Sequence, residues 1–460
     1  MFATVKDDER VIVSGTGSQI MAGGRSAGGV GGDGTRAILD DPQLRKGFIA
    51  LVVTAFAVSF SMGLNNAISP NFFREEIGMD GSQNGYLVAF RELPGFLLAF
   101  VAALLLRLGM ARATGLALLI MGIGYASFAL SYSFTSVIIA SVIGSIGFHS
   151  WLQMQYALGL SLARPGEEGS VLGRVSSYGF VGRLLGMVGV LTTLFIAGRL
   201  ADSPDDVQGT IFRVIFVVSG VAGVLGAISI LRFPVDPNDR ALARAAPKVM
   251  LRKQYWLYYT LSFLDGCRME IYFAFAPFVL VEEFNVSATS ITLLLIMAAL
   301  INWRTAPWIG RLIDRFGERR MLTINYCGHF IVFLGFALSQ HVWLLYGFYL
   351  GYNFLFTFSI GTTTYLRKIA RKADIAPSLA MGVSWAHVAA VGVPVFGAAL
   401  WDRLGYQFPF LFGTAFVILS IIFTQKINVL KQRMDDPDQD ATGAAAAPRG
   451  ATPQPATGGK

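Results

Sequence analysis

Charged residues are scarce in this sequence of 460 residues, because Asp, Glu, Lys and Arg together make up 14% of it. A soluble protein of ordinary composition carries about 25% charged residues. Hydrophobic residues make up 54% instead, and Phe alone occurs 36 times. This balance excludes an ordinary water-soluble fold and favours a chain whose solvent is largely lipid.

Cysteine and histidine are also rare, with two and four copies. Both cysteines, Cys267 and Cys327, fall in apolar stretches, which excludes a disulfide framework. No His, Cys or Asp cluster has the spacing of metal ligands, and no nucleophile stands beside a base in a recognisable motif. The glycine-rich run at 23–34 follows no strand and opens no helix, so it does not predict a phosphate-binding loop. We therefore expect no enzyme, no metal and no cofactor.

Long apolar stretches divide the rest of the chain. A helix needs about 20 apolar residues to cross the hydrocarbon core of a bilayer, and twelve stretches predict such helices. They are Phe48–Ser69, Gln83–Leu106, Thr114–Ser131, Thr135–Leu162, Val171–Ala197, Ile211–Leu231, Tyr255–Val281, Ser290–Ile309, Leu322–Ser339, Val342–Tyr365, Ser378–Trp401 and Phe408–Thr424. The sequence therefore predicts an all-α membrane protein with twelve transmembrane helices.

Lys and Arg are distributed unequally between the connecting loops. One set of alternate loops holds clusters such as Arg311 to Arg320 and Arg367 to Lys372, whereas the other set holds only Arg74, Arg199 and Arg403. Cytoplasmic loops carry the excess of basic residues, so we expect both termini in the cytoplasm and the protein in the cell (inner or cytoplasmic) membrane. The net charge of +8 then reflects membrane topology, and we expect no nucleic acid partner.

The segment from 233 to 253 is the longest internal connection and is basic. It divides the spans six and six, which predicts an N-terminal six-helix bundle at 47–232, a cytoplasmic linker at 233–253 and a C-terminal six-helix bundle at 254–426. The tails at 1–46 and 427–460 are rich in small and polar residues, which predicts cytoplasmic segments without a packed core.

A motif after the eighth span resembles the signature loop of the major facilitator superfamily, in which glycine, leucine, an acid and basic residues recur at fixed spacing. Every defining position is present: Gly310, Leu312, Asp314, Arg315, Gly317, Arg319 and Arg320. A remnant of the motif after the second span supports an internal repeat. The resemblance implies two pseudo-symmetric six-helix bundles around a central cavity, and Asp314 can hold a charge-assisted contact between two helices.

Charged side chains inside the predicted spans are functional candidates, because a charge at bilayer depth needs a partner or water. They are Arg91, Glu92, Arg183, Asp265, Arg268, Glu270 and Arg304. Asp265 and Arg268 are three residues apart on one helix face and can form a neutralising pair, whereas Arg91 and Glu92 diverge by about 100°. Either these residues line a polar cavity, or they form neutralising pairs that lock the two halves together and never contact solute.

Uncharged polar residues in the spans add further candidates, for which a buried interhelical hydrogen bond is the alternative to solute contact. These are His149 and Gln153, which share one helix face, together with Tyr352 and His387. Of the neighbours Asn65 and Asn66 we expect only one to face inward. Gly182 and Gly186 in the fifth span allow a close helix approach.

These features predict a secondary transporter that moves a small solute by alternating access. The surplus of arginine over acids in the spans favours an organic anion. Glu92, Asp265 or Glu270 can carry a coupled proton, since a desolvated carboxyl can hold one near neutral pH. We expect a monomer whose partners are the solute, protons and the lipid bilayer. Two alternatives stay open: a drug or metabolite efflux permease, and a related bundle that senses or assembles rather than transports.

Overall fold

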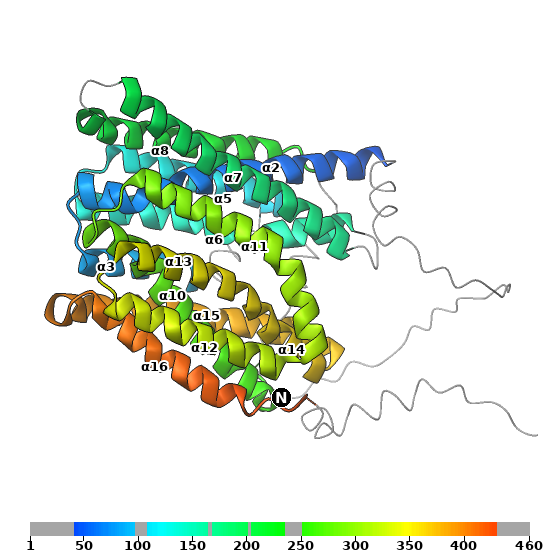
Figure 1. Cartoon of the computed structure of the whole chain (residues 1–460). Coiled ribbons are helices and arrows are strands. Elements are labelled where there is room, and N and C mark those ends of the chain that lie inside the picture. The colour runs from blue at the N-terminus through cyan, green and yellow to red at the C-terminus, as the bar shows by residue number, and fades with distance from the viewer. Residues whose placement is uncertain (1–40, 97–107, 164–167, 201–203, 235–250, 430–460) are drawn as a thin grey trace, which may run out of the picture.

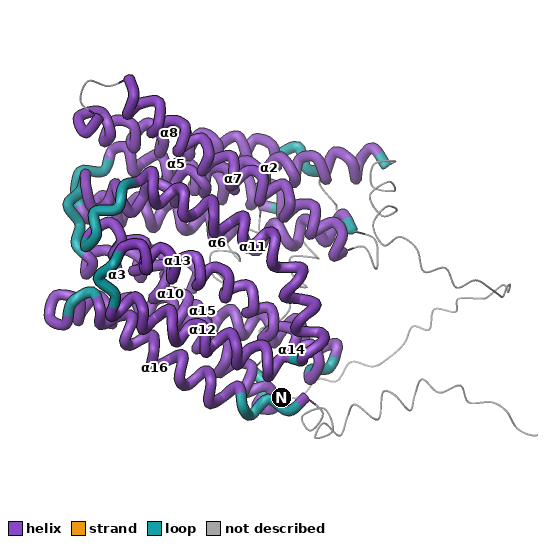
Figure 2. The backbone as a smooth tube through the Cα atoms, viewed as in Figure 1, coloured by secondary structure: helices purple, strands orange, loops and turns teal. Residues whose placement is uncertain are grey.

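The computed structural model describes residues 41–96, 108–163, 168–200, 204–234 and 251–429. Helices run side by side through these ranges (Figure 1), and no strand occurs in them (Figure 2). The first group of helices is α2 (Pro42–Asn71) with η1 (Phe72–Glu76), α3 (Gly81–Phe96), α5 (Met110–Ser127) with η3 (Phe128–Leu130), α6 (Phe134–Leu162), α7 (Glu168–Leu200) and α8 (Pro204–Ile230). The second group is η4 (Lys253–Tyr255) with α10 (Trp256–Glu282), α11 (Ala288–Phe316), α12 (Glu318–Leu338), α13 (Val342–Phe356) with η5 (Thr357–Ser359) and α14 (Ile360–Ile369), α15 (Lys372–Leu404) and α16 (Gln407–Thr424).

Nine helices of the described part are long and apolar enough to cross a membrane. The three other predicted spans overlap α3, α10, and α13 with α14. The structure describes α3 only to Phe96, α10 carries Asp265, Arg268 and Glu270 in its middle and Glu282 at its end, and η5 interrupts the helix between α13 and α14. The all-helical class is confirmed, and the count of twelve crossings stays a prediction for these three elements.

Local sequence explains where several helices begin and end. The carboxylate of Asp41 accepts hydrogen bonds from the main-chain N–H groups of Gln43, at 2.8 Å, and Leu44, at 3.3 Å, which caps α2. Pro42 follows at the first helical position, where its missing N–H is harmless. Gly317 ends α11 with a φ of 81°, a conformation that glycine adopts at little cost. We call the end of the bundle where α2 begins the Pro42 side, and the end where η1 finishes the Glu76 side.

Glycines bring the helices of the first group close together. α2 packs on α7 and α8, and α5 packs on α6 and α8. A methyl group added at Gly182 would collide with the carbonyl oxygen of Phe56, and one at Gly186 would collide with that of Phe60. The close helix approach predicted from these two glycines is therefore confirmed.

Aromatic side chains fill the interior of the second group. The rings of Tyr272 and Tyr352 stack with centroids 3.5 Å apart and planes 8° apart. The hydroxyl of Tyr272 donates to the carbonyl oxygen of Tyr349 at 2.7 Å and accepts from the amide of Asn353 at 2.9 Å. The buried hydroxyl of Tyr272 and the buried amide of Asn353 thus have partners, as burial of polar groups requires.

Contacts at the Glu76 side join the two groups. The indole of Trp401 lies against Gly81, where any side chain would collide with it. The amide of Asn71 donates to the carbonyl oxygen of Val286 at 3.0 Å. These contacts tie the start of α3 and the end of α2 to the second group on this side of the bundle.

The predicted linker and tails fall largely outside the described residues, which omit 1–40, 235–250 and 430–460. The boundaries at 47–232 and 254–426 therefore stay predictions.

Candidate functional site

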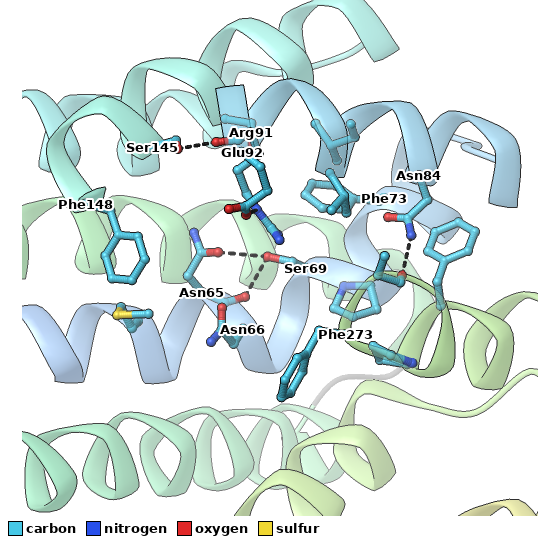
Figure 3. Close-up of a pocket in the computed structure, with 18 of the residues that line it drawn as sticks. Asn65, Asn66, Ser69, Phe73, Asn84, Arg91, Glu92, Ser145, Phe148 and Phe273 are labelled. Atoms are coloured by element: carbon cyan, nitrogen blue, oxygen red, sulfur yellow. Dashed lines mark hydrogen bonds and ion pairs between the residues drawn. The ribbon is translucent and has the colours of Figure 1, made fainter. Parts of the chain in front are cut away.

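A cavity of about 460 Å³ lies between the two helix groups. Residues of α2, α3, α5, α6 and α7 line it from the first group, and residues of α10, α11 and α13 line it from the second (Figure 3). Its polar lining is Asn65, Asn66, Ser69, Asn84, Arg91, Glu92, Tyr125, Ser141, Ser145, His149, Arg183, Glu270 and Tyr349. A volume of this size is in the range of sites for small organic molecules.

Two neighbouring asparagines of α2 both line the cavity (Figure 3). Ser69 donates its hydroxyl to the carbonyl oxygen of Asn65 at 2.7 Å and lies 3.0 Å from its side-chain oxygen. The side-chain nitrogen of Asn65 is buried and has no hydrogen-bond partner in the described residues. The expectation that only one of Asn65 and Asn66 faces inward was wrong, because the cavity covers an arc of α2 wide enough for adjacent residues.

Arg91 and Glu92 pair with each other at the cavity wall. The guanidinium Nε of Arg91 donates to Oε1 of Glu92 at 3.1 Å. Their Cα–Cβ directions diverge as expected for neighbours on a helix, but both side chains are long enough to meet. The divergence therefore does not keep the two charges apart.

Arg183 and Glu270 carry charges without partners. Both line the cavity, Arg183 from α7 and Glu270 from α10. The described residues provide neither with an ion pair or a hydrogen bond, although Glu270 is only 6% exposed. A buried charge without a partner is costly, so Glu270 is a group that a proton or a bound solute can satisfy, whereas the side chain of Arg183 is exposed and open to contact by a solute in the cavity.

Asp265 and Arg268 form the ion pair that their spacing predicts, but they do not line the cavity. Asp265 also accepts from the hydroxyl of Tyr326 at 3.2 Å and that of Thr362 at 3.0 Å. The guanidinium of Arg268 lies over the ring of Tyr326, 4.3 Å from its centroid. The pair therefore neutralises itself, but it joins α10 to α12 and α14 inside the second group rather than locking the two groups together.

The remaining predicted cavity residues lie away from its lining. Tyr352 is buried in the aromatic interior of the second group, whereas Gln153 and Arg304 are exposed. His387 of α15 lies near Glu92 and His149, with its Nδ1 atom 3.8 Å from Oε2 of Glu92. Sequence position alone could not sort these residues, because it does not give the rotation of each helix about its axis.

The signature loop connects α11 and α12 at the Pro42 side. Leu312 packs on a small apolar cluster that contains Ile313. Both Arg319 side-chain nitrogens Nε and Nη2 donate to the amide oxygen of Gln425, at 3.3 and 3.2 Å. Asp314 is exposed and has no ion pair within the described ranges. The contact expected of it is therefore missing from this conformation.

Sequence reasoning missed the acid that does form a charge contact next to this loop. Glu318, the first residue of α12, is 3% exposed and lies with its Oε1 atom 2.6 Å from Nζ of Lys368 in α14. Glu318 occupies a position that the motif leaves open, so the motif gave no signal. Asn84, also missed, donates its amide to the carbonyl oxygen of Ala274 at 2.7 Å.

A bundle of apolar helices around a cavity of charged and amide side chains defines a multi-pass membrane protein that can enclose a small solute. The family model of the Major Facilitator Superfamily matches residues 51–384. The chain therefore belongs to the major facilitator superfamily, a family of transporters rather than enzymes, and the resemblance carried by the signature loop is confirmed.

Solved structures share this fold at low sequence identity. A D-xylose–proton symporter has a TM-score of 0.66 and 16% identity, over 84% of this chain and 98% of its own. The nucleoside transporter NupG has a TM-score of 0.64 and 14% identity, over 83% and 100%. A bacterial homologue of the human lysosomal transporter Spinster has 0.62 and 13%, over 86% and 99%. No curated protein matches the sequence.

Proposed function

We propose that this protein is a secondary transporter of small organic anions and that a proton accompanies the solute. The observation that carries the proposal is the pair of cavity charges without partners, Arg183 and Glu270. The Arg91–Glu92 pair is neutral overall, so Arg183 and Glu270 set the net charge that a solute meets. A guanidinium without a carboxylate partner is well suited to bind a carboxylate or phosphate with two hydrogen bonds.

The arginine surplus counted along the predicted spans does not carry over to the cavity. Arg268 is neutralised by Asp265, and Arg304 does not line the cavity. Its lining therefore holds Arg91 and Arg183 against Glu92 and Glu270. A proton on Glu270 removes one negative charge and leaves Arg183 unbalanced, so an anion binds best when Glu270 is protonated. Protonation of Glu270 and binding of an anion at Arg183 are thereby coupled, and no other residue is needed for this coupling.

Alternating access follows from the position of the cavity between the two groups. We propose that the groups are the two six-helix bundles at 47–232 and 254–426, and that they rock about the cavity. The Pro42 side carries the basic residues around Arg311 and Arg367, so we assign it to the cytoplasm, with both termini, in the cell membrane. One copy of the chain contains the whole cavity, which fits a monomer.

The aromatic lining favours a second candidate function, efflux of amphipathic compounds. Phe73, Phe148 and Phe273 contribute rings to the wall between the polar groups (Figure 3). Such rings bind flat apolar parts of a ligand. This candidate differs from the first in the charge of the ligand that binds.

A thermal-shift screen of the purified protein separates the two candidates. The probes are succinate, gluconate and benzoate as anions, and ethidium and tetraphenylphosphonium as amphipathic cations. A ligand that binds the folded state raises the melting temperature by mass action, and we expect a rise with at least one anion. The stabilising anion is then tested for uptake into proteoliposomes with and without a pH gradient. Stabilisation by the cations alone supports efflux, and binding without any flux supports a sensor.

A further inference from the structure

Three side chains that can ligate a metal ion meet beside the cavity. They are Glu92 of α3, His149 of α6 and His387 of α15, and one ligand atom of each lies within 4.8 Å of the other two. Their side chains are 12%, 5% and 22% exposed. The sequence showed no metal-ligand spacing because the three residues come from three different helices.

The hydrogen bonds of His149 fix which of its nitrogens faces Glu92. Its Nδ1 atom lies 3.1 Å from the carbonyl oxygen of Ser145 and 2.9 Å from the hydroxyl oxygen of the same residue. A carbonyl oxygen only accepts, and the Ser145 hydroxyl donates to the carbonyl oxygen of Arg91. Nδ1 of His149 therefore carries a proton, and the lone pair of a neutral ring is on Nε2.

This lone pair points at another acceptor. Nε2 of His149 lies 3.3 Å from Oε2 of Glu92, and Nδ1 of His387 lies 3.8 Å from the same oxygen. The Nδ1 atom of His387 is buried and has no hydrogen-bond partner in the described residues. Two acceptors face each other at this distance only when a positive species lies between them, which is either a proton or a metal cation.

The distances suit a zinc ion. Zinc binds nitrogen and carboxylate oxygen at about 2.0–2.2 Å in tetrahedral geometry, which places neighbouring ligand atoms roughly 3.3–3.5 Å apart. The separation of His149 Nε2 from Oε2 of Glu92, 3.3 Å, lies in this range, that of His387 Nδ1 from the same oxygen, 3.8 Å, lies above it, and all three ligand atoms lie within 4.8 Å of one another. Two histidines and a glutamate are also a known zinc ligand set with a fourth position for water.

The surroundings of the cluster resemble the outer shell of a metal site. A ligating histidine donates its other N–H to a carbonyl or carboxylate, as His149 does to Ser145. Arg91, the nearest cation, contacts the other carboxylate oxygen, Oε1 of Glu92. Gly95 lies so close to both imidazoles that a methyl group there would collide with them. Only a residue without a side chain lets the two rings approach each other.

We propose that Glu92, His149 and His387 form a binding site for a divalent transition metal ion of the zinc class, which links α15 of the second group to α3 and α6 of the first. The inference stands on the geometry of these three residues and does not depend on the identity of the transported solute.

Zinc titration of the purified full-length protein, followed by calorimetry, tests the site. The affinity tag is removed and the protein is treated with a chelator beforehand. We expect one zinc ion per wild-type chain, and binding weakened at least about tenfold in His387→Gln and in His149→Gln, since loss of even an outer-shell partner weakens a site about tenfold or more. His341→Gln is the matched control, because His341 is exposed and lies outside the cluster.

Unchanged affinity in the His149→Gln/His387→Gln double variant overturns the proposal, and so does a wild-type protein that binds no zinc. In the latter case a proton is the positive species. Melting curves without metal show whether each variant folds. If His149→Gln is unstable, His387→Gln decides, since His387 is the more exposed ring. X-ray absorption of the zinc-loaded wild type is expected to show two imidazole ligands, and a spectrum without them also overturns the site.

Discussion

The amide of Asn84 in α3 donates a 2.7 Å hydrogen bond to the carbonyl oxygen of Ala274 in α10. This bond crosses from one helix group to the other on the Glu76 side, next to the cavity that both residues line. A parallel link is the ion pair of Arg74 with Glu282, at 3.3 Å. Such links stabilise the arrangement in which the Glu76 side is closed.

Replacement of Asn84 by Ala is expected to favour opening of the Glu76 side. Loss of one buried hydrogen bond destabilises the closed arrangement by about 1–2 kcal/mol, which shifts a two-state population roughly 5- to 30-fold. The measurement is the labelling rate of a cysteine placed at Asn66 by an impermeant maleimide, in a background without Cys267 and Cys327. Tyr86→Phe, on the same helix, is the control and should leave the rate unchanged. Equal labelling rates in Asn84→Ala, Tyr86→Phe and the parent protein would contradict the idea that the Asn84 hydrogen bond keeps the Glu76 side closed.

Substitution of Arg183 is expected to weaken anion binding. A hydrogen bond to a charged group contributes about 1.5–3 kcal/mol, so Arg183→Gln should raise the dissociation constant of the stabilising anion roughly tenfold to a hundredfold. Arg304→Gln provides a control of the same chemistry outside the cavity lining. Equal affinity in the two variants would exclude Arg183 as the anion-binding group.

A substitution of Glu270 tests whether the proton dependence of uptake can be lost while anion binding is kept. Glu270→Gln keeps the shape of the side chain and removes its ability to exchange a proton. We expect proteoliposomes with this variant to bind the anion and to lose stimulation of uptake by an inward proton gradient. Stimulation equal to that of the wild type would show that another group carries the proton, or that none does.

The interface between α2 and α7 should tolerate no side chain at Gly182. Enlargement at a close backbone contact typically destabilises by about 1–3 kcal/mol, so Gly182→Leu is expected to lower the melting temperature clearly. Gly189 of the same helix has open space around it, and Gly189→Leu should melt near the wild-type temperature. Similar melting of both variants would contradict the packing.

The ion pair of Glu318 with Lys368 predicts an asymmetry between its partners. Glu318 has a side chain that is 3% exposed, whereas that of Lys368 is 42% exposed. Lys368→Met leaves a buried carboxylate without its partner, while Glu318→Gln leaves an ammonium that water can reach. We expect Lys368→Met to destabilise by roughly 1–3 kcal/mol and Glu318→Gln by less, as measured by thermal melting. Asp314→Asn is the control, and the reverse order would contradict the assignment.

The sequence predicts the features of this protein that depend on one helix at a time. Apolar length predicts the spans, the Asp265–Arg268 spacing predicts an ion pair, and Gly182 predicts a close approach. The family follows from the loop at Gly310 to Arg320, whose residue types recur at fixed spacing.

What the sequence could not provide is the relation between helices. The meeting of Glu92, His149 and His387 depends on the rotation and depth of three helices that are far apart in the chain. For the same reason the sequence could not show that Arg304 lies outside the cavity lining, or that Asn65 and Asn66 both line it.

The short turn η5 (Thr357–Ser359) separates α13 from α14, which would otherwise form one continuous helix from Val342 to Ile369. A tighter turn inside a helix is a common position for a hinge. α13 is held by the stacked rings of Tyr272 and Tyr352, and α14 is held to α12 by the ion pair of Lys368 with Glu318. α13 can therefore tilt with α10, which carries Tyr272, and α14 can tilt with α12. A spectroscopic label on Gly347 in α13 and another on Thr364 in α14 should therefore report different motions during a transport cycle.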